Sequence, residues 1–284
     1  IVIDNPTSSI IPLMNTFSDN QDYEADMFVN NHEAKEIMDD NTLLVVVDTN
    51  KPSITQCEDL LYMAKMIVVL DHHRQGSDTI RNSVLSYIEP YASSASEMVA
   101  EILQYFTEGI RIRNVEADSI YAGIMIDTDN FMQKTGVRTF EAAAFLRRCG
   151  ADVTRVRKLF REDMNDYKAR GETIRNAELF RGQFAISECP SDYVARPTVV
   201  GAQAANELLN IVGVKASFVL TEYKGVIYIS ARAIDEVNVQ IIMERMGGGG
   251  HLNMAGCQLE TVDLEGARSL LKSTLTEMQD GGEI

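Results

Sequence analysis

The sequence predicts an α/β fold, in which a parallel-sheet domain with flanking helices precedes a smaller α+β domain and a cleft lies between the two. Two β-branched runs, at residues 42–50 and 66–73, each end in polar side chains, which is typical of strands buried on both faces of a parallel sheet. Helical patterns follow these runs, and alternating strands and helices favour an α/β sheet. The 284 residues, 45% of them hydrophobic, suffice for two such domains.

The first domain is predicted over residues 1–160. Its strands are TLLVVVDTN, which contains Asp48, and MIVVLDHH, which closes in Asp71, His72 and His73. Helices are predicted at ASEMVAEILQYF and VEADSIYAGIMI, where apolar residues recur at helical spacing. Ligands of such sheets bind beyond the carboxyl ends of the strands, so we expect the polar strand ends to form a site.

A charge-rich stretch, which has one Gly and no Pro between residues 151 and 180, predicts a helical linker at 161–180. The second domain is predicted over residues 181–284. Its elements are a helix (VVGAQAANELLNIV), a hairpin (ASFVLTEYKGVIYISARAI) with Lys224 and Gly225 at its turn, a second helix (VNVQIIMERM) and a terminal helix (LEGARSLLKSTLTEM). The glycine run MGGGGHLNMAG is predicted as a loop before a short strand.

The composition limits the possible partners. The formal net charge is -16, which disfavours long nucleic acids because lysine and arginine supply most affinity for phosphates. A nucleotide ligand should therefore be small and held locally, with metal cations helping to supply positive charge. No run of about 18 apolar residues occurs, so we expect no membrane contact from this segment itself. The four cysteines form no CxxC pair and are predicted to be free thiols.

Asp48, His72 and Asp127 are predicted to hold divalent metal ions. Asp127 lies in YAGIMIDTDNF, where an apolar segment again ends in Asp-Thr, as it does at Asp48. Oxygen and nitrogen ligands suit Mn²⁺, Fe²⁺ and Zn²⁺. A carboxylate can bridge two ions, and two ions about 3.5–4 Å apart activate a water for in-line phosphoryl displacement. The alternative, that each Asp only caps a turn, is favoured for a single Asp but not for the three motifs together.

His73 and Arg74 follow the predicted metal ligand His72. If Asp71 orients one histidine of the pair, His73 is free to contact phosphate or donate a proton. Glycines let backbone N–H groups approach an anion, so the glycine run with His251 is predicted to cradle a phosphate. The alternatives are a solvated loop histidine and, for Arg232, a surface arginine.

YASSASE predicts a helix N-terminus, in which Ser93 or Ser94 forms a capping box with Glu97 and the helix end could also bind an anion. The predicted catalytic residues are Asp48, His72, His73 and Asp127. The residues predicted to bind substrate are His73, Arg74, Ser93, Ser94, Ser230, Arg232, Gly249, Gly250 and His251.

The motifs DTN, DHH, DTDNF and GGGGH, in this order, resemble those of the DHH/DHHA1 phosphoesterase superfamily over nearly the whole chain. YIEPYASSASE, GVRTFEAAAFLRRCGAD and ISARAIDEVNVQIIMERMGGGGH are most similar to the catalytic region of bacterial cyclic-di-AMP phosphodiesterases. The resemblance implies hydrolysis of cyclic di-AMP to linear pApA with two Mn²⁺ ions, or with Mg²⁺ or Fe²⁺. It implies that Asp48 bridges the ions and that His72 and Asp127 complete the shell of one.

The resemblance further implies that a DHHA1 domain grips the nucleotide through Arg232, Gly249, Gly250 and His251. It implies a cytoplasmic domain of a membrane-anchored bacterial protein, with a PAS-like sensor and a degenerate GGDEF domain upstream, and we expect a homodimer. The family's earlier motif, a His followed by two spaced aspartates on a first strand, has no match before Asp48. Residues 1–15 resemble the segment that comes directly after that motif in the family.

Two alternative functions stay open. One is an oligoribonuclease or adenosine bisphosphate phosphatase of the same superfamily, because the same core serves that chemistry. The other is a cyclic-dinucleotide-binding sensor with impaired catalysis, which the unmatched first motif would favour.

Overall fold

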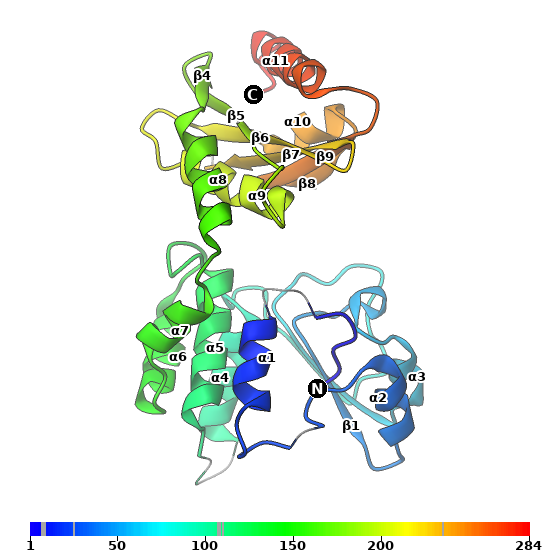
Figure 1. The fold of residues 1–284 in the computed structure, drawn as a ribbon. Coiled ribbons are helices and arrows are strands. Elements are labelled where there is room, and N and C mark those ends of the chain that lie inside the picture. Colours follow the sequence, from blue (N-terminus) through cyan, green and yellow to red (C-terminus); the bar gives the residue numbers. More distant parts are fainter. Residues whose placement is uncertain (7–9, 25, 107–108, 110, 235) are drawn as a thin grey trace. The chain divides into compact units, whose positions relative to one another are not determined.

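The computed structural model describes residues 1–6, 10–24, 26–106, 109, 111–234 and 236–284. The chain divides into two compact units, Ile1–Arg161 and Glu162–Ile284, each with its own sheet (Figure 1). Each unit also has its own hydrophobic core. The predicted α/β class is confirmed, since one unit contains a parallel sheet and the other a mixed sheet. Among the described helices, none combines the length and apolar character needed to cross a membrane.

The sheet of the first unit consists of three parallel strands in the order β1-β2-β3. These strands are β1 (Leu43–Val47), β2 (Met66–Asp71) and β3 (Leu85–Ile88). Val47 pairs with Leu70, so the chain leaves β1 at Asp48 level with Asp71 on β2. The helices of this unit are α1 (Ile11–Ser18), α2 (Asn31–Ile37), η1 (Pro52–Ile54), α3 (Asp59–Met63), α4 (Ala95–Tyr105), α5 (Asn114–Asp127), α6 (Val137–Arg148) and α7 (Val153–Leu159).

Burial differs between the two strands that the sequence predicted. On β2, Ile67 and Val69 are fully buried, as expected for a strand inside a parallel sheet. On β1, the side chains of Leu43, Val45 and Val47 are about half exposed, so the expectation of burial on both faces is wrong for this strand. The exposed side chains alternate along β1, so one face of this strand is not covered, whereas Val46 on the other face is buried.

Helices α4, α5 and α6 lie side by side (Figure 1). They pack on one another through a shared core of small and aliphatic side chains. Ala100, Ile124 and Leu146, one from each helix, are fully buried there. The helical pattern of residues 115–126 is confirmed, and α5 extends to Asp127. Asp127 is therefore the last residue of a helix, whereas Asp48 and His72 directly follow strands.

The second unit contains six strands in the order β4-β5-β6-β7-β9-β8, of which only β5 and β6 pair in parallel. The strands are β4 (Glu178–Phe180), β5 (Phe184–Cys189), β6 (Ala216–Tyr223), β7 (Val226–Ala233), β8 (Gly249–His251) and β9 (Met254–Leu259). The helices are α8 (Met164–Arg175), α9 (Pro197–Leu208), α10 (Val239–Arg245) and α11 (Leu264–Asp280). The four segments predicted for this domain all form.

The hairpin turn between β6 and β7 lies where the sequence predicts it. Lys224 and Gly225 have φ of 52° and 77°, and two successive left-handed residues are the geometry of a type I′ hairpin turn.

The glycine run differs from the prediction, because Gly249–His251 is the edge strand β8 and not a loop. The close approach of β8 and its flank to β9 explains two of the glycines. A Cβ on Gly248 would lie 2.1 Å from the carbonyl oxygen of Gly256, and one on Gly250 would lie 2.5 Å from Cα of Ala255.

Candidate metal centre and anion-binding face

Asp48 reaches the edge of the first sheet through a turn of left-handed backbone. Its φ is 64°, a region that Asp tolerates better than most residues. Its N–H donates to the carbonyl oxygen of Leu70 at 3.0 Å, which ties the turn to β2. The Asp48 side chain is 56% exposed, so its carboxylate is open to a ligand on the solvent side.

His72 lies between the two predicted carboxylate ligands. Its Nε2 lies 3.2 Å from Oδ1 of Asp48 and 3.9 Å from Oδ2 of Asp127. Its Nδ1 lies 3.3 Å from the carbonyl oxygen of Ala92, and both a carbonyl and an ionised carboxylate only accept, so the protonated ring satisfies the contacts at Nδ1 and at Nε2. In the neutral tautomer that keeps the proton on Nδ1, the lone pair of Nε2 faces the two carboxylates.

Asp48 contributes to the pKa shifts of both of its neighbours in this site. The hydrogen bond to Asp48 is the main influence that raises the pKa of His72. Burial, followed by the negative charge of Asp48, raises the pKa of Asp127. Negative potential at this point attracts a proton or a cation, and two carboxylate oxygens with one imidazole nitrogen are suitable ligands for Mn²⁺, Fe²⁺ or Zn²⁺. The residues present therefore fit a divalent metal ion.

His73 also belongs to this cluster, which the sequence did not predict as a ligand set. One ligand atom from each of Asp48, His72 and His73 lies within 4.8 Å of the others. The two imidazole rings have centroids 4.4 Å apart. His73 is accordingly a candidate ligand in addition to its predicted contact with phosphate.

A fully buried carboxylate orients His73. Oδ1 of Asp71 accepts from Nδ1 of His73 at 2.7 Å and from its backbone N–H at 3.1 Å. Oδ2 of Asp71 accepts from the side-chain amide of Asn50, which also donates to the carbonyl oxygen of His73 at 3.3 Å. Asn50 is a residue that sequence reasoning missed, although it is the last residue of the motif DTN.

The side chains of the other residues predicted in the first unit make no hydrogen bond or ion pair with the side chains of Asp48, His72, His73 or Asp127 in the described part of the chain. Ser94 is the N-cap of α4 and accepts from the N–H of Glu97 at 3.0 Å, whereas the Ser93 hydroxyl donates to the Glu97 carboxylate. Both serines are buried and their hydroxyls serve the start of the helix, and their contact with substrate stays a prediction. Arg74 is exposed and makes no side-chain hydrogen bond or ion pair with another described residue.

In the second unit, the register brings four of the five predicted binding residues onto one face of the sheet. Arg232, Met254 and His251 form one row across β7, β9 and β8, and Ser230, Gly256 and Gly249 form the next. Paired residues share a face and alternate along a strand, so both rows face the same side. Gly250 is the exception, because it pairs with Ala255, which lies in the buried core on the opposite face.

Arg232 is the charged residue of this face. Its Nη1 donates to the carbonyl oxygen of Ala231 at 2.9 Å, while its Nε is buried without a hydrogen-bond partner among the described residues. Burial lowers the pKa of the guanidinium. A Cβ on Gly249 would meet no atom within 4 Å, so the space above this glycine is open. A half-buried guanidinium on the same sheet face as the open Gly249 is suited to an anionic ligand.

Comparisons with known proteins agree with the two-unit organisation. Residues 4–124 match the DHH family, N-terminal domain, and residues 183–277 match the DHHA1 domain. The chain is 43% identical over 252 residues to the cyclic-di-AMP phosphodiesterase GdpP of Geobacillus thermodenitrificans, and this match covers 88% of the chain but only 38% of that protein. It is 28% identical over 221 residues to the bifunctional oligoribonuclease and PAP phosphatase NrnA of Mycoplasma genitalium, covering 75% of the chain and 68% of that protein.

Among solved structures, an exopolyphosphatase-related protein from Bacteroides fragilis superimposes with a TM-score of 0.78. The alignment covers 98% of the chain and 83% of that protein at 20% sequence identity. At this identity the likeness establishes a shared fold.

Proposed function

The chain belongs to the DHH family and carries a DHHA1 domain, and from this premise we propose that it is a metal-dependent phosphodiesterase that hydrolyses cyclic di-AMP to linear pApA. The observation that carries the proposal is the convergence of Asp48 and Asp127 on Nε2 of His72, at 3.2 and 3.9 Å. The 43% identity to a cyclic-di-AMP phosphodiesterase supports the choice of substrate.

In the proposed site, Asp48, His72 and Asp127 would hold a divalent cation, with Mn²⁺ as the expected metal. When bound, such a cation supplies the positive charge that a phosphodiester needs as it is attacked. The second ion that the resemblance implies would require further ligands, and the additional candidate in the group around Asp48, among the described residues, is His73.

His73 is the residue of the chain best placed to move a proton. Asp71 holds its Nδ1, so Nε2 remains available to a phosphate oxygen or to the departing ribose oxygen. The buried Asp71 also fixes the orientation of the ring, so Nε2 would stay turned toward a bound phosphate.

The second unit would bind the nucleotide through its polar sheet face. Arg232 would pair with a phosphate, and Gly249 would leave room for the ligand to approach the backbone of β8. The domain limits, the membrane anchoring and the homodimer expected from the resemblance also belong to this proposal.

The test is an assay of the purified protein with Mn²⁺ and cyclic di-AMP, with the products separated by chromatography. We expect linear pApA to appear, and we expect the Asp127→Asn variant to lose at least about 100-fold in rate because a ligand of the cation is weakened. Asp129→Asn is a matched control, because Asp129 is exposed, lies on the same turn and makes no ion pair with His72. Equal rates for wild type and Asp127→Asn would refute the metal role.

The same assay separates the alternatives. An oligoribonuclease or bisphosphate phosphatase, for which the 28% identity to NrnA is the specific support, would turn over linear pApA or adenosine 3′,5′-bisphosphate faster than cyclic di-AMP. A sensor would bind cyclic di-AMP without Mn²⁺ and release no product.

A further inference from the structure

We propose that Glu97 is a positioning residue of the metal centre, which acts on the imidazole of His72 through the single peptide group between Ala92 and Ser93. We also infer that Arg138 holds Glu97 in this position. The inference rests on the metal site proposed above, because His72 is one of its ligands.

The first step is the unusual burial of Glu97. This carboxylate is 1% exposed and lies in the first turn of α4. A capping box would turn it back to the N–H of the N-cap residue Ser94. Instead, its Oε2 accepts from the N–H of Ser93 at 3.3 Å and from the Ser93 hydroxyl. Burying a charged group is costly, and an ion pair in the interior offsets this cost only weakly. Uncharged side chains can cap a helix, so capping alone does not account for a buried carboxylate here.

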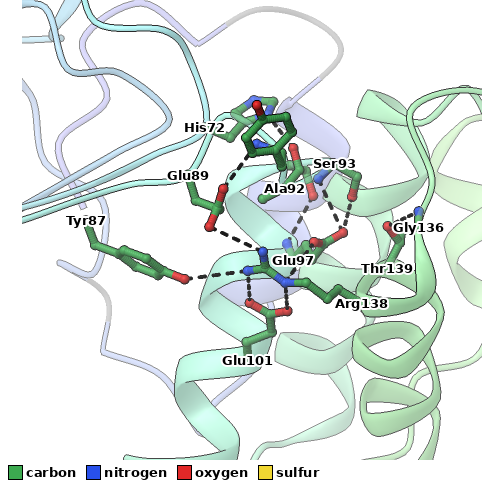
Figure 2. A network of polar contacts seen from close by, with 12 residues as sticks. His72, Tyr87, Glu89, Ala92, Ser93, Glu97, Glu101, Gly136, Arg138 and Thr139 are labelled. Carbon is green, nitrogen blue, oxygen red and sulfur yellow. Dashed lines mark hydrogen bonds and ion pairs between the residues drawn. The ribbon is translucent and has the colours of Figure 1, made fainter.

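The second step is that one peptide group joins Glu97 to His72. The N–H of Ser93 and the carbonyl of Ala92 belong to the same peptide unit, and its two polar ends point in opposite directions. The N–H end donates to Glu97, and the carbonyl end accepts the Nδ1 proton of His72 at 3.3 Å. Figure 2 shows His72, Ala92, Ser93 and Glu97 in this sequence of contacts.

This connection has two physical consequences. The fixed carbonyl favours the tautomer with the proton on Nδ1, which leaves Nε2 free to bind a cation. The charge of Glu97 also polarises the peptide, because hydrogen bonds in a chain strengthen one another, and it makes the Ala92 oxygen a better acceptor. A better acceptor at Nδ1 makes Nε2 a stronger ligand.

The third step is Arg138, the second residue of α6. Its guanidinium donates to both oxygens of Glu101 at 2.7 Å and lies 3.4 Å from Glu89 and 4.0 Å from Oε1 of Glu97 (Figure 2). Oε1 is the oxygen of Glu97 that Ser93 does not use. Arg138 therefore compensates the charge of Glu97 without competing for its contact with the peptide.

Arg138 also connects this peptide to the segment after Asp127. Helix α5 ends at Asp127, and α6, which carries Arg138, begins at Val137. On the other side, the carbonyl oxygen of Glu89 accepts from the N–H of Ala92 at 3.0 Å. Arg138 thus links the turn between Glu89 and Ala92, which contacts His72, to helix α6, which follows the candidate ligand Asp127.

Glu101 provides a matched control for Glu97. Both residues lie on α4, about one turn apart, and both face Arg138. Glu101 makes no contact with Ser93, and with Tyr87 it lines a surface pocket of about 950 Å³. Glu101→Gln therefore removes a carboxylate from the same guanidinium without touching the peptide behind His72.

The first measurement is the tautomer of His72 in metal-free protein, read from ¹⁵N-histidine spectra at a pH where imidazoles are neutral. The chain has four histidines, so the signals can be assigned with single His variants. The carbonyl of Ala92 at Nδ1 and the carboxylate of Asp48 at Nε2 compete for the proton of the neutral ring, and we expect the Nδ1-protonated share to be the same in wild type and in Glu101→Gln. In Glu97→Gln and Glu97→Ala we expect the Nδ1-protonated share to fall and the Nε2-protonated share to rise. Thermal unfolding of each variant checks its fold, and Glu97→Gln keeps the side-chain shape if Glu97→Ala does not fold.

The second measurement is Mn²⁺ affinity by titration calorimetry. We expect Glu97→Gln to bind Mn²⁺ about 10–100-fold more weakly than wild type, the usual effect of losing an outer partner of a ligand, and Glu101→Gln to bind almost as wild type does. Unchanged tautomer populations and Mn²⁺ affinity in the folded Glu97 variants would overturn the inference. If wild type binds no Mn²⁺, the proposed function fails, and the tautomer measurement still decides the role of Glu97.

Discussion

Oδ1 of Asp48 lies 3.2 Å from Nε2 of His72, although Asp48 holds a left-handed backbone with φ of 64°. The contact joins the ends of two adjacent parallel strands, because Val47 of β1 pairs with Leu70 of β2. Asp48 thus combines a strained backbone with an exposed carboxylate. Strain of this kind is concentrated at binding and catalytic sites, so the combination indicates a functional role for Asp48.

Replacing Asp48 by Asn separates stability from metal binding. Asn tolerates the left-handed backbone as well as Asp does, and the change removes one of the two charges that face Nε2 of His72. At about pH 9, well above the ordinary histidine pKa of about 6.5, we expect the metal-free variant to be at least as stable as wild type. Relief of the repulsion that contributes to the raised pKa of Asp127 is the reason.

Thermal unfolding with and without Mn²⁺ checks this prediction. Mn²⁺ should raise the Tm of wild type, because a ligand that binds only the folded state stabilises it, but should leave the Tm of Asp48→Asn almost unchanged. An equal rise in both proteins would show that Asp48 is not a ligand.

The stability of the metal-free protein should depend on pH through His72. Its pKa is raised, chiefly by the hydrogen bond to Asp48, so the folded state holds the proton more tightly than the unfolded chain. This stabilisation is complete below the ordinary pKa of about 6.5 and is lost as the pH rises through the raised pKa.

The measurement is the Tm of wild type and of His72→Asn in the presence of a chelator, across that pH range. The advantage of wild type should shrink as the pH rises, while the Mn²⁺ affinity of wild type should increase because the metal displaces the same proton. A Tm difference that is independent of pH would exclude His72 as the titrating group.

The sequence was sufficient to predict the elements whose patterns are local. The strand at Met66–Asp71 reads as an apolar run because Ile67 and Val69 are buried. The Lys224-Gly225 turn follows from the tolerance of its residues for positive φ. These features depend on neighbouring residues, and a sequence pattern records them directly.

Features that depend on pairing between distant segments were not predictable in this way. The glycine run reads as a loop, yet Gly249–His251 is a strand because Gly248 and Gly250 allow β9 to approach closely. Likewise, the pattern SSASE predicts a helix cap, but not that Glu97 would turn to the peptide behind His72. The partner of each contact lies outside the pattern, so only the folded chain identifies it.

Replacement by alanine should lower the stability of the protein at Gly248 and raise it at Gly249. Gly248→Ala places a Cβ 2.1 Å from a backbone oxygen and 2.5 Å from Cβ of Cys257, so we expect a loss of about 1–3 kcal/mol in the free energy of unfolding. Gly249→Ala meets no atom within 4 Å and needs no positive φ, so stability should rise by about 0.4–1 kcal/mol. Urea unfolding measures both changes.

Gly249 nevertheless lies on the face of Arg232 and His251, where we propose that the nucleotide binds. We therefore expect Gly249→Ala to weaken cyclic di-AMP binding despite its higher stability, as titration calorimetry would detect. If Gly249→Ala binds cyclic di-AMP as tightly as wild type does, the nucleotide does not bind at this face of the sheet.

Arg232→Gln should stabilise the protein while it weakens ligand binding. The Nε of Arg232 is buried without a hydrogen-bond partner among the residues that the structure describes, and burial lowers the pKa of the guanidinium. A half-buried guanidinium with an unpartnered Nε and no ion pair among the described residues is unfavourable, so its removal should raise the free energy of unfolding by about 1 kcal/mol. A phosphate would provide the missing partner, so the same change should weaken cyclic di-AMP binding by about 10-fold or more, since charged hydrogen bonds contribute about 1.5–3 kcal/mol.

Arg181→Gln is the control, because Arg181 forms an exposed ion pair with Asp280 in the same unit and such pairs contribute little. A less stable Arg232→Gln that binds cyclic di-AMP as wild type does would show that Arg232 is structural and that the phosphate lies elsewhere.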